Sequence, residues 1–251
     1  MDKTLQAHIQ LPADLGVAYA LLPGDPARVE RAKAFLEQPV DLVFNREYKS
    51  VMGNYQGTKV LVISSGIGGP STAIAIEELA AIGIKGIIRI GSCGALQPGM
   101  KLGDLVIATA AVRDEGTSKA YVEPVYPAVA DLSLLMVMKA ITDHKEMPHR
   151  FGIVRSHDSF YTAREEALTT YWRGKGIVGS DMETAALFVL GGLKGMQVAS
   201  ILNVVVAPEG APEEGVRRFV DGEELTRQGE QNQIALALET FRMLALQKEE
   251  T

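Results

Sequence analysis

Three arginines in the sequence stand beside glycines or turn residues, where they could bind an oxyanion. Arg28 follows the Gly-Asp-Pro turn that begins at Gly24, and Arg46 lies in the segment NREYKS. Arg89 ends an apolar run shortly before Ser92. Guanidinium groups hold tetrahedral anions by charge-assisted hydrogen bonds, and glycine N–H groups and a serine hydroxyl can complete such a pocket. The three arginines together predict an anion site.

Arg89 is unusual because isoleucines flank it on both sides, as in a buried strand. A buried guanidinium without a partner is strongly unfavourable. The cation therefore either pairs with a carboxylate of the protein or is held ready for an anion. For any one of the three arginines, pairing with a local acid such as Asp25 or Glu47 remains an alternative. Their shared position beside glycine turns favours the anion site.

Other residue patterns predict no further chemistry. Cys93, the single cysteine, lacks the histidine partner that a nucleophilic thiol needs, and we expect it to be a packing residue. His157 and Asp158 are adjacent and would point to opposite faces of a strand, so neither is assigned a catalytic role. The loop GIGGPS departs from G-x-G-x-x-G at Ser71, and no Walker lysine follows a glycine loop. The four histidines show no zinc-ligand spacing.

The composition predicts a globular protein with a sizeable core and no nucleic-acid or membrane partner. The chain has 251 residues, of which 47% are hydrophobic, and 25 lysines and arginines face 31 aspartates and glutamates for a net charge of -6. An acidic surface disfavours nucleic acid and anionic lipid. Residues 1–16 are polar without an apolar signal core, and no apolar run is long enough to span a bilayer. We expect a cytoplasmic protein.

Short runs rich in Val, Ile and Leu alternate with segments of helical periodicity. Such alternation predicts an α/β fold with a central mixed, largely parallel β-sheet flanked by helices. No repeat or linker interrupts the pattern, so residues 1–251 are expected to form a single domain. The expected strands, some with their following loops, are residues 17–24, 59–69, 84–94, 103–113, 150–160 and 196–206, and the expected helices are 27–37, 71–83, 180–195 and 224–247.

Seven segments occur in an order and at spacings that are specific to one family. They are PGDPARVERA, NREYKSV, SSGIGGPSTAIAIEEL, RIGSCGALQPGMKLGDLVIATAAVR, YPAVAD, HDSFY and SDMETAALF. Together they make the chain similar to the hexameric nucleoside phosphorylases of the uridine phosphorylase and purine nucleoside phosphorylase family. The resemblance extends from about His8 to the C-terminal helix and implies a nucleoside phosphorylase-like fold and activity.

The resemblance implies which residues hold phosphate and ribose. For the three residues implied to bind ribose, a purely structural role remains an alternative. Met182 could be a core residue, Glu183 an acid at a helix N-terminus, and His8 a surface histidine. Arg89 and Glu183 are the implied catalytic residues. The implied phosphate ligands are Gly24, Arg28, Arg89, Ser92 and, from a neighbouring subunit, Arg46; the implied ribose ligands are Met182, Glu183 and, again from a neighbour, His8.

The resemblance also implies a homo-oligomer with shared sites, expected to be a hexamer built as a trimer of dimers. Nucleoside and inorganic phosphate are the implied small-molecule partners, with phosphate as co-substrate and no other cofactor. In some relatives a structural potassium ion binds between subunits. The matching positions here are Glu47, Ile67 and Ser71.

The base is the least determined part of the substrate. The implied base-binding residues are Cys93, Gly94, Phe160, Tyr161 and Arg164. Purine enzymes of this type carry an aspartate that protonates N7, but this chain has Val204 and Val205 there, preceded by Asn203. A valine cannot donate a proton, which weakens the purine interpretation.

The uracil-reading pair of enteric uridine phosphorylases is not intact either. Where those enzymes have Gln-x-Arg, this chain has Arg164 and Glu166. Arg164 could still donate to a uracil carbonyl, and Phe160 and Tyr161 could stack on the base. We therefore expect uridine as the first choice and a purine nucleoside as the second. A nucleosidase, which uses water instead of phosphate, and a non-enzymatic nucleoside-binding protein remain as more distant alternatives.

Overall fold

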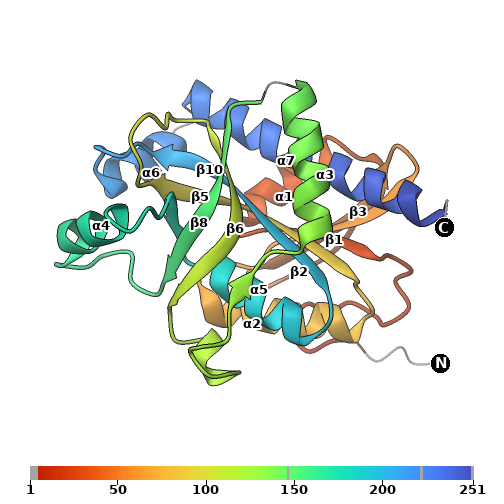
Figure 1. Ribbon diagram of the computed structural model, residues 1–251. Helices are drawn as coiled ribbons and strands as arrows, with labels where there is room; N and C mark the ends of the chain where they lie inside the picture. Colours follow the sequence, from red (N-terminus) through yellow and green to blue (C-terminus); the bar gives the residue numbers. More distant parts are fainter. Residues whose placement is uncertain (1–4, 146, 221–222, 250–251) are drawn as a thin grey trace.

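The computed structural model describes residues 5–145, 147–220 and 223–249. Within these residues, ten strands form one mixed sheet in the order β10-β6-β8-β9-β5-β1-β4-β3-β2, with β7 beside β6 (Figure 1). The sheet closes partly on itself, because β10 pairs with β5 as well as with β6. The strands are β1 (Tyr19–Pro23), β2 (Glu37–Asn45), β3 (Tyr48–Tyr55), β4 (Thr58–Ile63), β5 (Gly86–Ala95), β6 (Leu105–Asp114), β7 (Ala128–Val129), β8 (His149–His157), β9 (Gly179–Asp181) and β10 (Gln197–Val206).

Helices cover both faces of this sheet. The buried side chains of α1, α3 and α7 pack into one hydrophobic core and those of α2 and α5 into a second, on the opposite face. Helices α4 and α6 lie at one end of the molecule (left in Figure 1). The helices are α1 (Pro26–Lys33), α2 (Gly69–Ala81), the short 3-10 helix η1 (Ser118–Ala120), α3 (Leu132–Lys145), α4 (Glu165–Arg173), α5 (Thr184–Leu193), α6 (Pro212–Val220) and α7 (Glu224–Glu249).

The strand pairings confirm the predicted α/β class with a mixed sheet. Parallel pairs join β4 to β1, β1 to β5, and β5 to β10, and a second parallel set joins β6, β8 and β9. Antiparallel pairs occupy the β2–β3–β4 edge and the junction of β10 with β6. The carboxyl ends of β1, β5 and β10 consequently meet at one edge of the sheet.

Alternation along β5 decides where Arg89 points. Ile87 packs into the core beneath α2 and α5, whereas Ile88 and Ile90 pack into the core beneath α1, α3 and α7. Successive side chains of a strand face opposite sides of the sheet. Arg89 therefore shares the face of Ile87 and points toward the amino-terminal ends of α2 and α5.

Two predicted helices differ from those observed. The helix expected over 27–37 ends at Lys33, because the chain turns there and enters β2 at Glu37. The helix expected from residue 180 begins only at Thr184, because the preceding residues form β9. Strand β9 is extended because it pairs with both β5 and β8. This extension places Asp181 and Glu183 immediately before the helix rather than inside it.

Among the described residues, no helix combines the length and the apolar composition needed to cross a bilayer.

Helix α7 packs against the β5–β6 connection through two glycines. A Cβ on Gly229 would lie 2.2 Å from the side-chain oxygen of Asn203 and 2.7 Å from the backbone of Gly103. Gly103 has φ +87, and a Cβ there would lie 2.4 Å from the carbonyl oxygen of Leu225. Backbone atoms cannot move aside as a flexible side chain can, so both positions require glycine.

We predict that Gly229→Ala destabilises the protein by about 1–3 kcal/mol, because the added methyl overpacks this contact. Helix propensity alone would favour alanine by about 1 kcal/mol. The matched control is Gly192→Ala in α5, where the new Cβ would meet Tyr126 Oη at an ordinary 3.5 Å. Urea unfolding measures both variants. If Gly229→Ala is as stable as Gly192→Ala, the described packing of α7 is wrong.

Candidate active site

A cavity of about 720 Å³ lies at the carboxyl ends of β1, β5, β8 and β10, where α/β sheets place their ligands. One part of its wall is charged and another is apolar. The charged part includes Arg28, Glu47, Arg89, Asp181 and Glu183, beside Gly24 and Ser92. The apolar part includes Cys93, Leu96, Phe160, Val205, Val206, Pro208, Val216 and Phe219.

Arg89 enters the cavity as a fully buried cation held by two carboxylates. Its Nε donates to Asp181 Oδ2 at 3.2 Å, and its Nη2 donates to Glu183 Oε2 at 2.5 Å. Burial opposes the charge, but Glu183 and Asp181 outweigh it and raise the pKa of Arg89. A Cβ on Gly91 would lie 2.5 Å from Arg89 Nη2, so the guanidinium can fold over this position only because it is glycine.

Asp181 is fixed in turn by the start of α5. Its Oδ2 accepts from the backbone N of Thr184 at 3.0 Å and from Thr184 Oγ1 at 2.6 Å. Its Oδ1 accepts from Ser156 Oγ at 2.6 Å. These bonds cap the amino-terminal end of the helix, where a negative charge is favourable. Asp181 therefore holds Arg89 while itself being held by β8 and α5.

Glu183 joins Arg89 to the glycine loop before α2. Its Oε1 accepts from the backbone N of Gly68 at 2.6 Å, and its Oε2 accepts from Arg89. Burial raises the pKa of Glu183; Arg89 opposes this rise and Asp181 adds to it. Each carboxylate oxygen has a second lone pair. Glu183 can therefore accept further hydrogen bonds from hydroxyl groups in the cavity.

Arg28 is also buried, and its partner comes from the far end of the chain. Its Nε donates to Glu230 Oε2 at 2.7 Å, its Nη1 to the Ile90 carbonyl at 2.9 Å, and its Nη2 to Ser92 Oγ at 3.0 Å. Glu230 lies on α7 and also binds Arg31. Burial lowers the pKa of Arg28, and Glu230 opposes this effect. The predicted alternative of a local acidic partner is thus wrong for Arg28, since Asp25 pairs with Arg31 instead.

One nitrogen of Arg89 remains unsatisfied. Nη1 is buried and, within the described part of the chain, has no hydrogen-bond partner. It lies 3.8 Å from the place that a Cβ on Gly24 would occupy, so the glycine leaves its approach open. A buried charged donor without a partner is costly. The cluster of Gly24, Arg28, Arg89 and Ser92 therefore offers an anion a preformed place.

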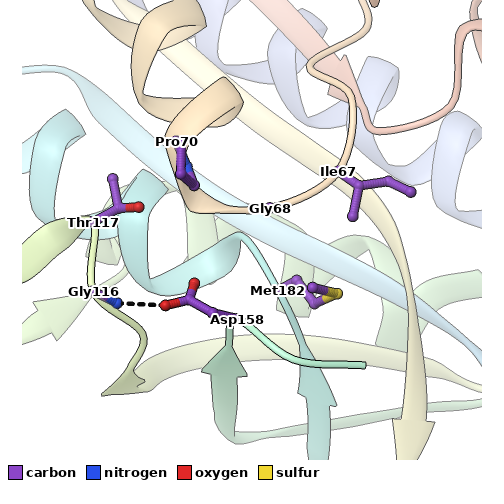
Figure 2. Close-up of a pocket in the computed structure, with 7 residues that line it drawn as sticks. All are labelled: Ile67, Gly68, Pro70, Gly116, Thr117, Asp158 and Met182. Atoms are coloured by element: carbon purple, nitrogen blue, oxygen red, sulfur yellow. Dashed lines mark hydrogen bonds between the residues drawn. The ribbon is translucent and has the colours of Figure 1, made fainter. Parts of the chain in front are cut away.

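Met182 also lines a second cavity of about 580 Å³, whose wall residues are drawn in Figure 2. In Figure 2 Ile67, Gly68 and Pro70 lie on one side of this second cavity, and Asp158 accepts a hydrogen bond of 2.7 Å from the backbone N of Gly116. Met182 and Ile67 belong to the walls of both cavities. The alternative that Met182 is an ordinary core residue is therefore wrong, because Met182 lines both cavities.

Four of the residues predicted to bind phosphate, ribose or base lie outside the walls of both cavities. Arg46 is exposed at the β2–β3 turn with φ 55, and His8 forms a 2.6 Å hydrogen bond from Nδ1 to Glu78. Tyr161 and Arg164 are exposed in the segment that leads into α4. The roles predicted for Arg46 and His8 are in a neighbouring subunit's site, so their absence from the walls of this chain's cavities agrees with that expectation without testing it.

At the apolar end, Cys93, Gly94 and Phe160 line the cavity as the sequence predicted. Burial, together with the nearby Asp181, raises the pKa of the Cys93 thiol, so the thiol stays protonated and is a poor nucleophile. Sequence reasoning missed Glu165 and Thr169 of α4, which also line the cavity. Helix α6, with Val216 and Phe219 in the wall, was missed as well, although its apolar side chains do follow a helical spacing.

The structure brings together the three residues predicted to bind potassium. Ser71 Oγ donates to the Ile67 carbonyl at 3.2 Å. Glu47 packs against Gly66 close to them, since a Cβ on Gly66 would lie 2.7 Å from Glu47 Cγ and 3.3 Å from Ser71 Oγ. The three residues are thus near neighbours, and cation binding there stays a prediction.

Comparisons with known proteins agree with this architecture. The sequence profile described as the phosphorylase superfamily matches residues 18–242. A uridine phosphorylase from Thermococcus kodakarensis is 42% identical over 81% of this chain and 78% of its own length. A guanosine phosphorylase from Halorubrum lacusprofundi is 39% identical over 74% of this chain and 76% of its own length. The crystal structure of a uridine phosphorylase from Vibrio fischeri ES114 is 43% identical, covers 96% of this chain and 97% of its own, and has a TM-score of 0.90.

We predict that Glu230→Gln destabilises the protein by about 3–5 kcal/mol, because it leaves the buried Arg28 with a neutral partner. The matched control on the same helix is Glu239→Gln, which removes a more exposed pair with Arg242. That change should cost about 1 kcal/mol or less. Urea unfolding measures both. Equal costs for the two variants would show that Glu230 does not compensate a buried charge.

Proposed function

The chain belongs to the phosphorylase superfamily, and from this premise we propose that it is a nucleoside phosphorylase that transfers the ribosyl group of uridine to inorganic phosphate. The observation that carries the proposal is Nη1 of Arg89, which has no partner in the described part of the chain and belongs to the same charged wall as Arg28 and Ser92. A dianionic phosphate supplies the acceptor that this buried donor lacks.

Phosphate is bound by groups that the fold has already ordered. Arg89 donates through Nη1, and Arg28 keeps a second N–H on each of its terminal nitrogens. Ser92 and the backbone at Gly24 complete the pocket. Because these groups are buried and fixed by carboxylates, little reorganisation accompanies binding, and their hydrogen bonds are stronger than in water.

The ribose lies between phosphate and base, with Met182 against one face. The Glu183 carboxylate accepts from the ribose hydroxyls and so fixes C1′ over the phosphate. As the bond from C1′ to the base nitrogen breaks, its electron pair leaves with the base and positive charge develops on the sugar. A phosphate oxygen then forms the new bond to C1′, giving ribose 1-phosphate. The negative charges of phosphate and Glu183 stabilise the cationic transition state.

Uridine is the preferred substrate in this proposal because valines stand at the end of β10 where purine enzymes of this type carry the aspartate that protonates N7. Val205 lines the cavity and Val204 is fully buried, and neither can donate a proton. A uracil leaving group does not need such an acid. The second candidate is a 6-oxopurine nucleoside, which is favoured by the similarity to a guanosine phosphorylase.

The proposed active unit is an oligomer in which subunits share sites, a hexamer by the family resemblance. This part of the proposal is supported by Arg46 and His8, which present polar side chains on the surface away from this chain's own cavity. A structural potassium ion at Glu47, Ile67 and Ser71 belongs to the same proposal.

We predict that the protein releases uracil from uridine only when phosphate is present, and that kcat/KM for uridine exceeds that for inosine. Arg89→Ala should lower kcat/KM by about two to three orders of magnitude, because one charge-assisted contact is worth about 2–4 kcal/mol in the transition state. The control is Arg150→Ala, which removes an exposed arginine of β8. Phosphate-independent release would indicate a nucleosidase, and a preference for inosine would indicate the purine candidate.

If sites are shared, mixing two inactive variants should restore activity. Arg46→Ala impairs the site of a neighbour, whereas Glu183→Ala impairs the subunit's own site. A hybrid interface can therefore combine one intact Arg46 with one intact Glu183. We predict measurable uridine phosphorolysis after the two purified variants are unfolded together and refolded, but not after each is refolded alone. Hybrids without activity would contradict a shared site.

A further inference from the structure

Glu165 is a polar residue of the cavity wall that the proposed phosphate and ribose sites do not use. It is the first residue of α4 and lines the cavity with Thr169 of the same helix. Its Oε1 accepts from Thr169 Oγ1 at 3.2 Å. Its Oε2 is buried and has no hydrogen-bond partner among the described residues. A buried carboxylate oxygen in a cavity wall without a donor is costly unless a ligand supplies one.

The position of Glu165 is held by the other end of its helix. Arg173 Nε donates to the Leu96 carbonyl at 2.8 Å, and Arg173 Nη2 donates to the Pro208 carbonyl at 2.5 Å. Leu96 and Pro208 both belong to the apolar wall of the cavity. Helix α4 is therefore tied to the loops after β5 and β10, and its first turn has a defined place over the cavity.

Within the described part of the chain, no donor is paired with Glu165 Oε2. Phe160 and Val206 are apolar, and His157 donates through Nδ1 to the Ser159 carbonyl at 3.0 Å. Burial, with Arg155 nearby, lowers the pKa of His157, and Glu165 only partly opposes this effect. With Nδ1 donating to Ser159, the neutral ring presents Nε2 as a second acceptor. Among the described residues of the wall, the Ser180 hydroxyl also has no hydrogen-bond partner; Ser180 lies on β9 and pairs with Gly94 of β5. The end formed by α4 thus presents acceptors among apolar side chains.

We propose that Glu165 is the specificity-determining residue for the base, with its Oε2 accepting a hydrogen bond from a ring N–H that is adjacent to a carbonyl group. This inference rests on the proposed function. Uracil carries such a group at N3, and 6-oxopurines carry it at N1. Cytosine and adenine have an unprotonated ring nitrogen at the equivalent place, which would face the carboxylate as a second acceptor. The cavity therefore selects bases with the O=C–N–H element.

The contact should act on binding more than on the chemical step. An acceptor at N–H does not withdraw charge from the departing base, and a carboxylate there opposes the negative charge that develops on it, so the contact stabilises the ground state at least as much as the transition state. Its loss should then raise the dissociation constant and KM and leave kcat nearly unchanged. A merely structural role for Glu165 would not distinguish between bases.

The test is the equilibrium binding of uridine and 3-methyluridine, measured by calorimetry in phosphate-free buffer. Methylation at N3 removes the donor. The wild-type protein should bind 3-methyluridine about 10- to 100-fold more weakly than uridine, as expected for a hydrogen bond to a charged group. Glu165→Ala should bind the two nucleosides within about threefold of each other, because the acceptor is gone. Glu166→Gln, an exposed carboxylate one residue later, should behave like wild type.

Glu165→Gln provides a second measurement in which the size of the side chain is kept. The amide can donate as well as accept. Cytidine, measured as a competitive inhibitor of uridine cleavage or directly by calorimetry, should therefore bind about 10-fold more tightly relative to uridine than it does to wild type.

The outcomes separate this inference from the proposed function. If uridine binds but the N3-methyl penalty is the same in wild type and Glu165→Ala, Glu165 does not read the base, while phosphorolysis can still hold. If the penalty depends on Glu165 but no phosphorolysis occurs, the inference holds and the proposed function fails. If uridine does not bind, or if Glu165→Gln does not improve cytidine binding relative to uridine, the inference is overturned.

Discussion

The burial of Arg89 is the constraint on which the site depends. A guanidinium at the end of a central strand must be compensated, and Asp181 and Glu183 compensate it from the segment that enters α5. This requirement explains why the chain is extended in β9 and becomes helical only at Thr184. It also explains why Gly91 lacks a side chain, since the guanidinium occupies that space. The two carboxylates satisfy two of the three nitrogens, and the third is left for a ligand.

Arg28 follows the same principle with a different partner. Its carboxylate comes from α7, so the C-terminal helix has to approach the β-sheet closely enough for Glu230 to reach the cavity. Gly229, the residue before Glu230, allows helix α7 to come this close, because it has no side chain where it contacts the loop at Gly103. Packing at one end of the molecule thus determines electrostatics in the site. Such long-range compensation keeps the cations rigid before any substrate is bound.

The sequence predicted those parts of the site that depend on local patterns. Arg89 lies at a strand end that its apolar neighbours reveal, beside Ser92, whereas the Met182–Glu183 pair and Phe160 were implied by the family resemblance of their short segments. All five residues lie in the cavity wall. The partner of Arg28 could not be found in this way, because Glu230 is 202 residues away and its helix shows only amphipathic periodicity. Glu165 was likewise hidden, since its place over the cavity depends on Arg173 binding two distant carbonyl groups. Local periodicity predicts elements, whereas these contacts depend on how the elements pack.

We propose that Arg89 Nη1, which has no hydrogen-bond partner among the described residues, is held for phosphate. A crystal structure of the protein grown in the presence of phosphate tests it most directly. The account predicts a phosphate oxygen within hydrogen-bond distance of Arg89 Nη1, with further contacts to Arg28 and Ser92 and with the Asp181 and Glu183 pairs retained. A phosphate bound elsewhere, or a cavity in which Nη1 still has no anionic partner, would contradict it.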